Sequence, residues 1–345
     1  MRYYVDSSVK LSGDGSKEKP FKKIQMAADI AMPGDEILVL PGIYREEVSP
    51  VHAGLPGKPI VYRSLEEKKA IITGAERIDD WTHYQGDVWK VEIENERFHD
   101  FNPYTSMVFG DWLTEDTVAH RGEVFLNDKS LYEQTTLEAV LDPVIDTKSW
   151  DKDFTKHSWY TCQSEDQERT VIYANFQGAH PNEENVEITF RARCFFPKFE
   201  HVDYITLDGF TVTKAATNWA PPTAFQEGMV GPHWSKGWLI QNCDISHSKC
   251  SGISLGKYYQ QHNDNKWTRF KLKDGTQTQR DCTLIAQLDG WSKDTIGSHT
   301  VRNCHIHHCG QTGIVGNLGC VFSTIENCHI HHINNKRNLR GAETG

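Results

Sequence analysis

Cysteine and histidine are concentrated in two matching segments of the sequence, 24 positions apart. The first contains Cys304, His305, His307, His308 and Cys309, and the second contains Cys328, His329, His331 and His332. Thiolate and imidazole are zinc ligands, so a metal site is one interpretation. Stacked coils of a repeat protein, however, place equivalent residues about 4.8 Å apart, as neighbouring strands do. We therefore expect side-chain ladders, and no metal.

Tryptophan accompanies small polar residues in three further segments, at 109–112 (FGDW), 218–222 (NWAPP) and 233–238 (HWSKGW). Indole faces stack on sugar rings, and neighbouring Asn, Asp and His side chains can bond sugar hydroxyls. For any single Trp, packing of a loop against the core is the better interpretation. As a set, these segments favour carbohydrate binding.

Hydrolysis of a glycoside needs two carboxyl groups on either side of the scissile bond. Asp203, Asp208 and Asp244 occupy different positions of the repeat described below, and each has an ordinary turn or surface explanation. Glu343 has no such explanation. No pair of carboxyls stands out, so the catalytic residues are left unassigned.

An internal repeat predicts the elements that position these side chains. Residues 301–308 (VRNCHIHH) recur at 325–332 (IENCHIHH), with an earlier copy at 240–247 (IQNCDISH) and a weaker one at 207–212 (LDGFTV). Each copy predicts two short strands around a bend, where Asn or Gly tolerates a positive φ. Coils of about two dozen residues indicate an all-β fold, the right-handed parallel β-helix.

The rest of the chain divides around this repeat. Residues 1–78 predict an N-terminal capping helix and the first coils, 79–200 an inserted flanking β-sandwich, and 201–345 further coils. A loop at 257–295 explains the step of 61 from Asn242 to Asn303. No amphipathic helix is evident between 200 and 345, which disfavours a TIM barrel.

Composition excludes several classes of protein. The 345 residues carry 37 basic and 47 acidic side chains, a net charge of -10, with no basic stripe, so nucleic acid is not an expected partner. No apolar run is long enough to cross a bilayer and no export signal is evident, which predicts a cytoplasmic protein without a membrane partner. Nine cysteines in a reducing compartment predict free thiols.

Several longer motifs closely resemble the β-xylosidases of glycoside hydrolase family 120. They are FNPY at 101–104, FGDWL at 109–113, YANFQGA at 173–179, PNEE at 181–184, WAPPT at 219–223, WSKGW at 234–238 and GWSK at 290–293. The resemblance implies a right-handed parallel β-helix with a flanking β-sandwich, a homo-oligomer, and release of xylose from short xylo-oligosaccharides with retention of configuration. It also implies an Asp nucleophile, a Glu acid/base and no cofactor or metal ion.

The resemblance also assigns two substrate-binding residues. The sugar-lining Trp of the family corresponds to Trp112, and its substrate-contacting Glu to Glu343, although Ala342 replaces the usual preceding His. The nucleophile and acid/base of the family lie on later coils. We therefore expect them beyond residue 345, so that this chain is either the N-terminal portion of a longer enzyme or a truncated gene product, without activity of its own. A stack that stopped here would also leave strand edges uncapped.

Two other functions remain open. A pectate-lyase-like polysaccharide lyase shares this architecture and uses Ca²⁺ held by carboxylates, but no close acidic cluster falls on consecutive coils. A non-catalytic carbohydrate-binding β-helix is the other alternative.

Overall fold

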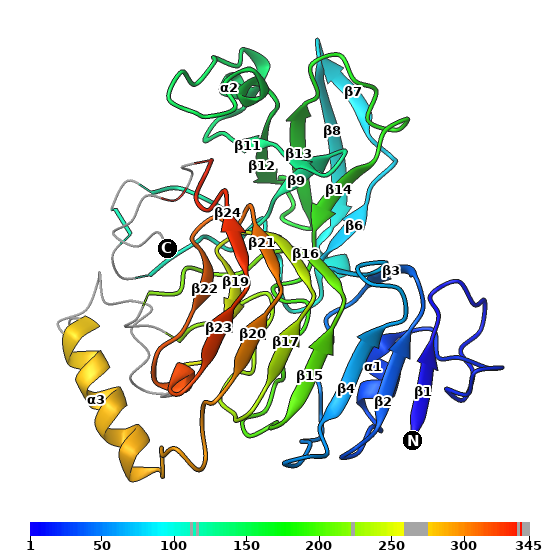
Figure 1. Cartoon of the computed structure of the whole chain (residues 1–345). Coiled ribbons are helices and arrows are strands. Elements are labelled where there is room, and N and C mark those ends of the chain that lie inside the picture. Colours follow the sequence, from blue (N-terminus) through cyan, green and yellow to red (C-terminus); the bar gives the residue numbers. More distant parts are fainter. Residues whose placement is uncertain (111–112, 115–116, 222–224, 259–274, 337–338, 340–345) are drawn as a thin grey trace.

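A stack of parallel strands forms the larger part of the molecule (Figure 1). The structure, a computed structural model, describes residues 1–345 except 111–112, 115–116, 222–224, 259–274, 337–338 and 340–345. The first sheet contains, in spatial order, β1 (Arg2–Val5), β2 (Glu36–Val39), β4 (Ile60–Ser64), β15 (Ile205–Asp208), β17 (Leu239–Gln241), β20 (Thr300–Arg302) and β23 (Thr324–Glu326). The second contains β3 (Gly42–Arg45), β5 (Ala70–Thr73), β16 (Thr211–Ala215), β18 (Asp244–Ser248), β21 (His305–His307) and β24 (His329–His331).

The chain passes from sheet to sheet in successive coils. A third face is formed by β19 (Ser251–Ser254) and β22 (Thr312–Val315), and parallel bridges through Val230 and Phe195 extend it. After β22, the short 3₁₀ helix η4 (Leu318–Cys320) leads back to the first sheet. The register confirms the repeat, because Val301 pairs with Ile325 in one neighbouring coil and with Ile240 in the other.

The bends between the first two sheets have the backbone conformation expected from the sequence. Asn242, Asn303 and Asn327 have φ of 57°, 54° and 52°, and Gly209 has φ of 78°. Asn tolerates this left-handed region better than other residues with a Cβ. The Asn303 side chain also donates to Oδ1 of Asn242, at 3.3 Å, so the bends stack as a ladder.

Cysteine and histidine form the ladders expected from the sequence. The Sγ atoms of Cys243, Cys304 and Cys328 each approach a carbonyl oxygen of the preceding coil at 3.6–3.8 Å. The rings of His308 and His332 stack at 4.9 Å. All nine cysteines are free thiols, as predicted.

One apolar core runs through the stack. It joins strand residues such as Ile37, Leu207 and Val301 to residues of the helix α1 (Ile24–Ala28). Ile24 and Ala28 are at most 1% exposed. The helix lies beside the strands at the N-terminal end, where its small buried face closes the core (Figure 1).

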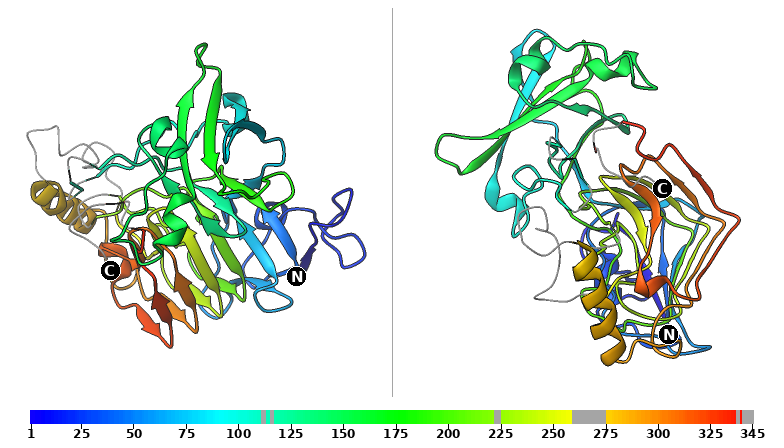
Figure 2. Two further views of the ribbon diagram at one scale, coloured as in Figure 1. Left: turned by 90° about the horizontal axis from the view of Figure 1, so that it is seen from above. Right: turned by 90° about the vertical axis from the view of Figure 1, so that its left-hand side faces the viewer.

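Two mainly antiparallel sheets form a second lobe beside the stack (Figure 2). One contains β6 (Ala75–Arg77), β9 (Val124–Leu126), β10 (Lys129–Ser130) and β14 (Val186–Thr189). The other contains β7 (Thr82–Gln85), β8 (Val88–Glu94), β11 (Tyr132–Glu133), β12 (Ser158–Gln163) and β13 (Arg169–Asn175). Three short helices join them: η1 (Asn95–Phe98), α2 (Leu137–Leu141) and η2 (Asp153–Lys156). Both sheets bury side chains in one core that includes Trp159, Ile172 and Ile188.

The segment expected to be a loop at 257–295 contains a helix, α3 (Gly275–Leu288), so the expectation of no helix between 200 and 345 was wrong. The apolar face of α3 is short: Cys282 and Ala286 are at most 2% exposed, whereas Leu284 and Leu288 are 61% and 85% exposed. Such a pattern gives weak periodicity in the sequence. In the part of the chain that the structure describes, no helix combines the length and apolar character needed to cross a membrane.

Candidate functional site

The two substrate-binding residues expected from the sequence, Trp112 and Glu343, lie outside the described residues. Two described residues that are close to them in the sequence, however, pack into the same cluster. Leu113 and Leu339 are buried in one apolar cluster, which we call the Trp219 cluster and which contains Val108, Leu113, Ala119, Trp219, Cys250 and Leu339. The fold therefore brings the segment around 109–113 and the segment around 339 to one side of the stack.

Close packing against Trp219 fixes the path of the first segment. A Cβ placed on Gly110 would lie 2.7 Å from Cδ1 of Trp219, so only glycine fits at this position without a shift. The amide of Phe109 donates to Oδ1 of Asn218, at 3.2 Å. Phe109 and Gly110, from one segment singled out in the sequence, thus pack against Asn218 and Trp219 from another.

Buried polar contacts fix the second of these segments against the coils. The amide of Ala220 donates to Oε1 of Gln311, at 2.8 Å, and the amide of Cys250 donates to Oγ1 of Thr217, at 2.8 Å. Gln311 and Thr217 are at most 1% exposed. Because a lost buried hydrogen bond leaves an unsatisfied group, these contacts hold the loop in one conformation.

Three tryptophans of the segments that, as a set, favoured carbohydrate binding are core residues. Trp219, Trp234 and Trp238 are 1%, 3% and 1% exposed. Nε1 of Trp238 donates to the carbonyl of Val202, at 2.7 Å, and Trp234 packs against Ala286 of α3. For these three the packing interpretation, preferred for any single Trp, is confirmed, because their apolar area is already buried by protein.

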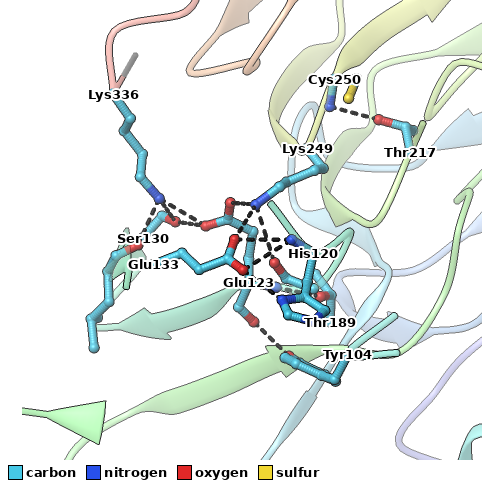
Figure 3. A network of polar contacts seen from close by, with 12 residues as sticks. Tyr104, His120, Glu123, Ser130, Glu133, Thr189, Thr217, Lys249, Cys250 and Lys336 are labelled. Atoms are coloured by element: carbon cyan, nitrogen blue, oxygen red, sulfur yellow. Dashed lines mark hydrogen bonds and ion pairs between the residues drawn. The ribbon is translucent and has the colours of Figure 1, made fainter. Parts of the chain in front are cut away.

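An ion network joins the second lobe to the stack (Figure 3). Glu123 precedes β9, and its two carboxylate oxygens contact Nζ of Lys249 at 2.7 Å and Nζ of Lys336 at 2.8 Å. Lys249 lies in the turn between β18 and β19. Lys336 also donates to Oγ of Ser130, at 2.7 Å, and to the carbonyl of Leu131, at 2.6 Å. One carboxylate therefore bridges three separate parts of the chain.

A second carboxylate extends this network. Oε1 of Glu133 lies 2.6 Å from Nδ1 of His120, and Oε2 lies 3.4 Å from Nζ of Lys249. The backbone amide of His120 donates to the same carboxylate at 2.9 Å. Two carboxylates and two lysines thus share a largely buried region.

Burial and charge act against each other in this network. Burial favours protonated Glu123, but Lys249 and Lys336 outweigh it and lower the pKa of Glu123 to about 2. Burial alone would lower the pKa of Lys249, yet Glu123 and Glu133 raise it. For Lys336 burial prevails and its pKa is lowered. Glu123 therefore stays ionised near neutral pH and is unsuited to act as a general acid.

Two cavities lie near the junction of lobe and stack. The first has a volume of about 270 Å³ and is lined by side chains that include Phe154, Trp150, His247 and Lys336. The second has a volume of about 1030 Å³, and its lining includes Glu47, Glu76 and Arg193. Ligand sites typically have volumes of about 300–1,000 Å³, so the first cavity lies near the lower end of this range and the second near the upper end.

The glutamates around the second cavity are neutralised by arginine. Arg193 contacts Glu47 at 2.9 Å and Glu227 at 2.6 Å, and Arg191 contacts Glu76 at 2.6 Å. All three glutamates are ion-pair partners of arginine, so none of them is singled out as an acid for glycoside cleavage.

Sequence patterns missed the ion network. Glu123 lies 126 residues from Lys249 and 213 residues from Lys336, so no local motif connects them. A charged residue directly before a buried strand, as Glu123 is before β9, was the one available signal.

Groups with the chemistry of metal ligands lie elsewhere, on the second parallel sheet. They are His305, His329 and His331, and Asp244, His305 and His307.

Comparison with known proteins gives one match to the second lobe and one to the whole chain. Residues 78–188 match the model "Glycoside hydrolase 120, insertion domain". Across its whole length the chain is similar to XylC, solved in a complex with xylose, with 44% identity and a TM-score of 0.94. The chain spans 56% of the length of that XylC chain.

Two other matches are more distant. A solved glycoside hydrolase is 11% identical, with a TM-score of 0.57 over 97% of this chain and 74% of its own, which shows a shared fold alone. The uncharacterized protein YwoF of Bacillus subtilis (strain 168) is 34% identical over 71 residues, 21% of this chain and 15% of YwoF. The insertion-domain match and the full-chain similarity to XylC confirm the resemblance to glycoside hydrolase family 120 that was seen in the sequence.

Proposed function

We propose that the complete protein is a retaining β-xylosidase that releases xylose from short xylo-oligosaccharides. The observation that carries this proposal is the 44% identity, over all of this chain, to a protein whose structure contains xylose. The similarity includes the segments that form the Trp219 cluster, beside which we place the sugar site.

Trp112 and Glu343 bind the substrate in this proposal. Trp112 offers an apolar face for a xylose ring, and Glu343 accepts hydrogen bonds from its hydroxyls. The burial of Leu113 and Leu339 in the Trp219 cluster supports this assignment, because it brings the two segments to one side of the stack.

The chemistry requires a carboxylate nucleophile and a carboxylic acid about 5–5.5 Å apart. The nucleophile attacks the anomeric carbon while the acid protonates the leaving oxygen, and the same acid residue then deprotonates the water that releases β-xylose. Glu123, Glu133 and Glu227 are held in ion pairs and are unsuited to these roles. We assign both roles to an Asp and a Glu beyond residue 345, consistent with the 56% of XylC that this chain spans.

Further features belong to the same proposal. The coils wind as a right-handed parallel β-helix, the hand that nearly all parallel crossovers adopt. Residues 1–78 form the cap and first coils, 79–200 the flanking β-sandwich, and 201–345 later coils. The protein acts in the cytoplasm as a homo-oligomer in xylan degradation, without a nucleic-acid or membrane partner.

Hydrolysis of an aryl β-xyloside by the complete protein tests the activity. NMR of the first product should show β-xylose, whereas α-xylose would contradict retention. Trp112→Ala and Glu343→Gln should each lower kcat/KM at least tenfold. Trp150→Ala is the matched control, since Trp150 is 55% exposed on the second lobe. An unsaturated product that disappears with chelator would instead identify a lyase, and saturable xylobiose binding without turnover an inert binding protein.

The placement of the catalytic pair has its own test. Residues 1–345 alone should bind xylobiose without hydrolysing it. Robust turnover by a homogeneous 39.4 kDa chain would overturn the assignment of both carboxyls beyond residue 345, while leaving the xylosidase activity in place.

A further inference from the structure

Four imidazoles form a grid on the outer face of two neighbouring strands. In the parallel pair β21 and β24, His305 is opposite His329, and His307 is opposite His331. Alternate residues of a strand point to one side, so all four rings share a face, while Ile306 between them is fully buried in the core. Nε2 of His305 lies only 2.6 Å from Nε2 of His331 across the grid.

Asp244 lies on β18, the strand that neighbours β21, and contacts two of the four rings. Its Oδ2 lies 3.0 Å from Nδ1 of His305, and its Oδ1 lies 3.2 Å from Nε2 of His307. An ionised carboxylate only accepts hydrogen bonds, so Nδ1 of His305 carries the proton. The lone pair of His305 is then on Nε2, the atom that faces His331.

We propose that His305, His329 and His331 form a surface site for a divalent transition metal such as Zn²⁺, with Asp244 as the supporting carboxylate. One ligand atom from each of the three histidines lies within 4.8 Å of the others. Histidines that bind a metal commonly donate their second ring N–H to a carboxylate, which is the relation between His305 and Asp244.

The donor set favours a borderline metal over Ca²⁺ or Mg²⁺. Imidazole nitrogen suits Zn²⁺, Cu²⁺ and Ni²⁺, whereas Ca²⁺ and Mg²⁺ prefer oxygen. Ligands at the usual Zn–N distance of about 2.0–2.1 Å in a tetrahedron are about 3.3 Å apart. Rotation of the exposed His329 and the half-buried His305 and His331 rings supplies the necessary shift. A fourth position remains for water.

The ion would join consecutive coils, because His305 belongs to β21 and both other ligands belong to β24. The histidine ladder predicted from the sequence positions the rings, and the hydrogen bond to Asp244 fixes which nitrogen of His305 can bind the metal. The site uses no residue of the proposed xylosidase machinery, so a failure of metal binding would not affect the proposed activity.

Titration calorimetry with Zn²⁺ at pH 7.5 tests the proposal on the complete protein, purified without a polyhistidine tag. We expect saturable binding of one Zn²⁺ per chain and a higher Tm when Zn²⁺ is present. His331→Asn should weaken binding at least tenfold, and Asp244→Asn by about 10–100-fold, the usual effect of losing a supporting carboxylate. Co²⁺ should give visible absorption bands that His331→Asn abolishes.

His83→Asn is the matched control. His83 is exposed on β7 of the second lobe, and its substitution should leave Zn²⁺ binding unchanged. His329→Asn changes the exposed ligand and guards against a folding defect in His331→Asn, with far-UV circular dichroism as the check. Absence of saturable binding, or equal binding by wild type, His331→Asn and His329→Asn, would overturn the site. Equal binding by Asp244→Asn alone would overturn the role of the carboxylate.

Discussion

Nζ of Lys249 lies 2.7 Å from Oε1 of Glu123, and both side chains are almost fully buried although they belong to different parts of the fold. Lys249 comes from a turn of the stack and Glu123 from the edge of the second lobe (Figure 3). Burying an ion pair costs desolvation, so such a pair adds little stability over an apolar one. Removing one partner is costly, however, because the other charge stays buried. The pair thus fixes how the lobe docks.

Replacing Lys249 by Met should lower the free energy of unfolding by about 3–5 kcal/mol, since Glu123 and Glu133 lose a shared buried cation. Urea unfolding followed by tryptophan fluorescence measures this change. Lys90→Met is the control: the Lys90–Glu92 pair is about one-third exposed and should contribute no more than about 1 kcal/mol. Equal effects of the two substitutions would show that Lys249 is not a docking residue.

His299 should make stability depend on mild acid. Its side chain is buried, and Nδ1 accepts the backbone N–H of Trp238 at 3.2 Å. Burial lowers the pKa of His299 from 6.5 to about 4. Below pH 6.5 the unfolded chain therefore binds a proton that the folded chain does not, and stability falls with pH until about pH 4.

We expect His299 to account for a loss of about 2 kcal/mol between pH 7.5 and pH 5, from 1.36 kcal/mol per pH unit below 6.5. His299→Asn keeps an acceptor for the Trp238 amide but does not titrate. Urea unfolding of both proteins at the two pH values isolates this contribution. If wild type and variant lose equal stability on acidification, His299 is not the cause.

Local chemistry explains what the sequence could predict. Asn303 and Asn327 indicated the bends, because Asn tolerates a positive φ and its recurrence gave the coil length. The burial of Trp219 and the pairing of Glu123 with Lys249 depend instead on packing between distant segments. The helix α3 was missed because the apolar stripe with Cys282 and Ala286 is short. Trp112 and Glu343 were assigned by resemblance, and their roles stay proposals.

The bend at Asn303 gives a prediction about the repeat itself. Its φ of 54° costs most residues with a Cβ about 1–2 kcal/mol, which Asn partly avoids. Asn303→Gly should change the free energy of unfolding by only a few tenths of a kcal/mol, Asn303→Ala should lower it by about 1 kcal/mol, and Asn303→Val by more. Thermal unfolding of the three variants measures this order. Equal effects of Gly and Val would mean that the loss of the bond to Asn242, common to all three, dominates.

The contact between Gly110 and Trp219 links packing to the proposed sugar site. A Cβ at position 110 would lie 2.7 Å from the indole, so Gly110→Ala should lower the free energy of unfolding by about 1–3 kcal/mol through overpacking. It should also raise the KM of the complete protein for an aryl β-xyloside, because the displaced segment leads to Trp112. Trp219→Ala removes the ring atoms that the Cβ would meet. The double variant should therefore lose less stability than the sum of the two single variants. Strict additivity in unfolding would show that the two residues do not share this contact, and an unchanged KM for Gly110→Ala would separate the Trp219 cluster from substrate binding.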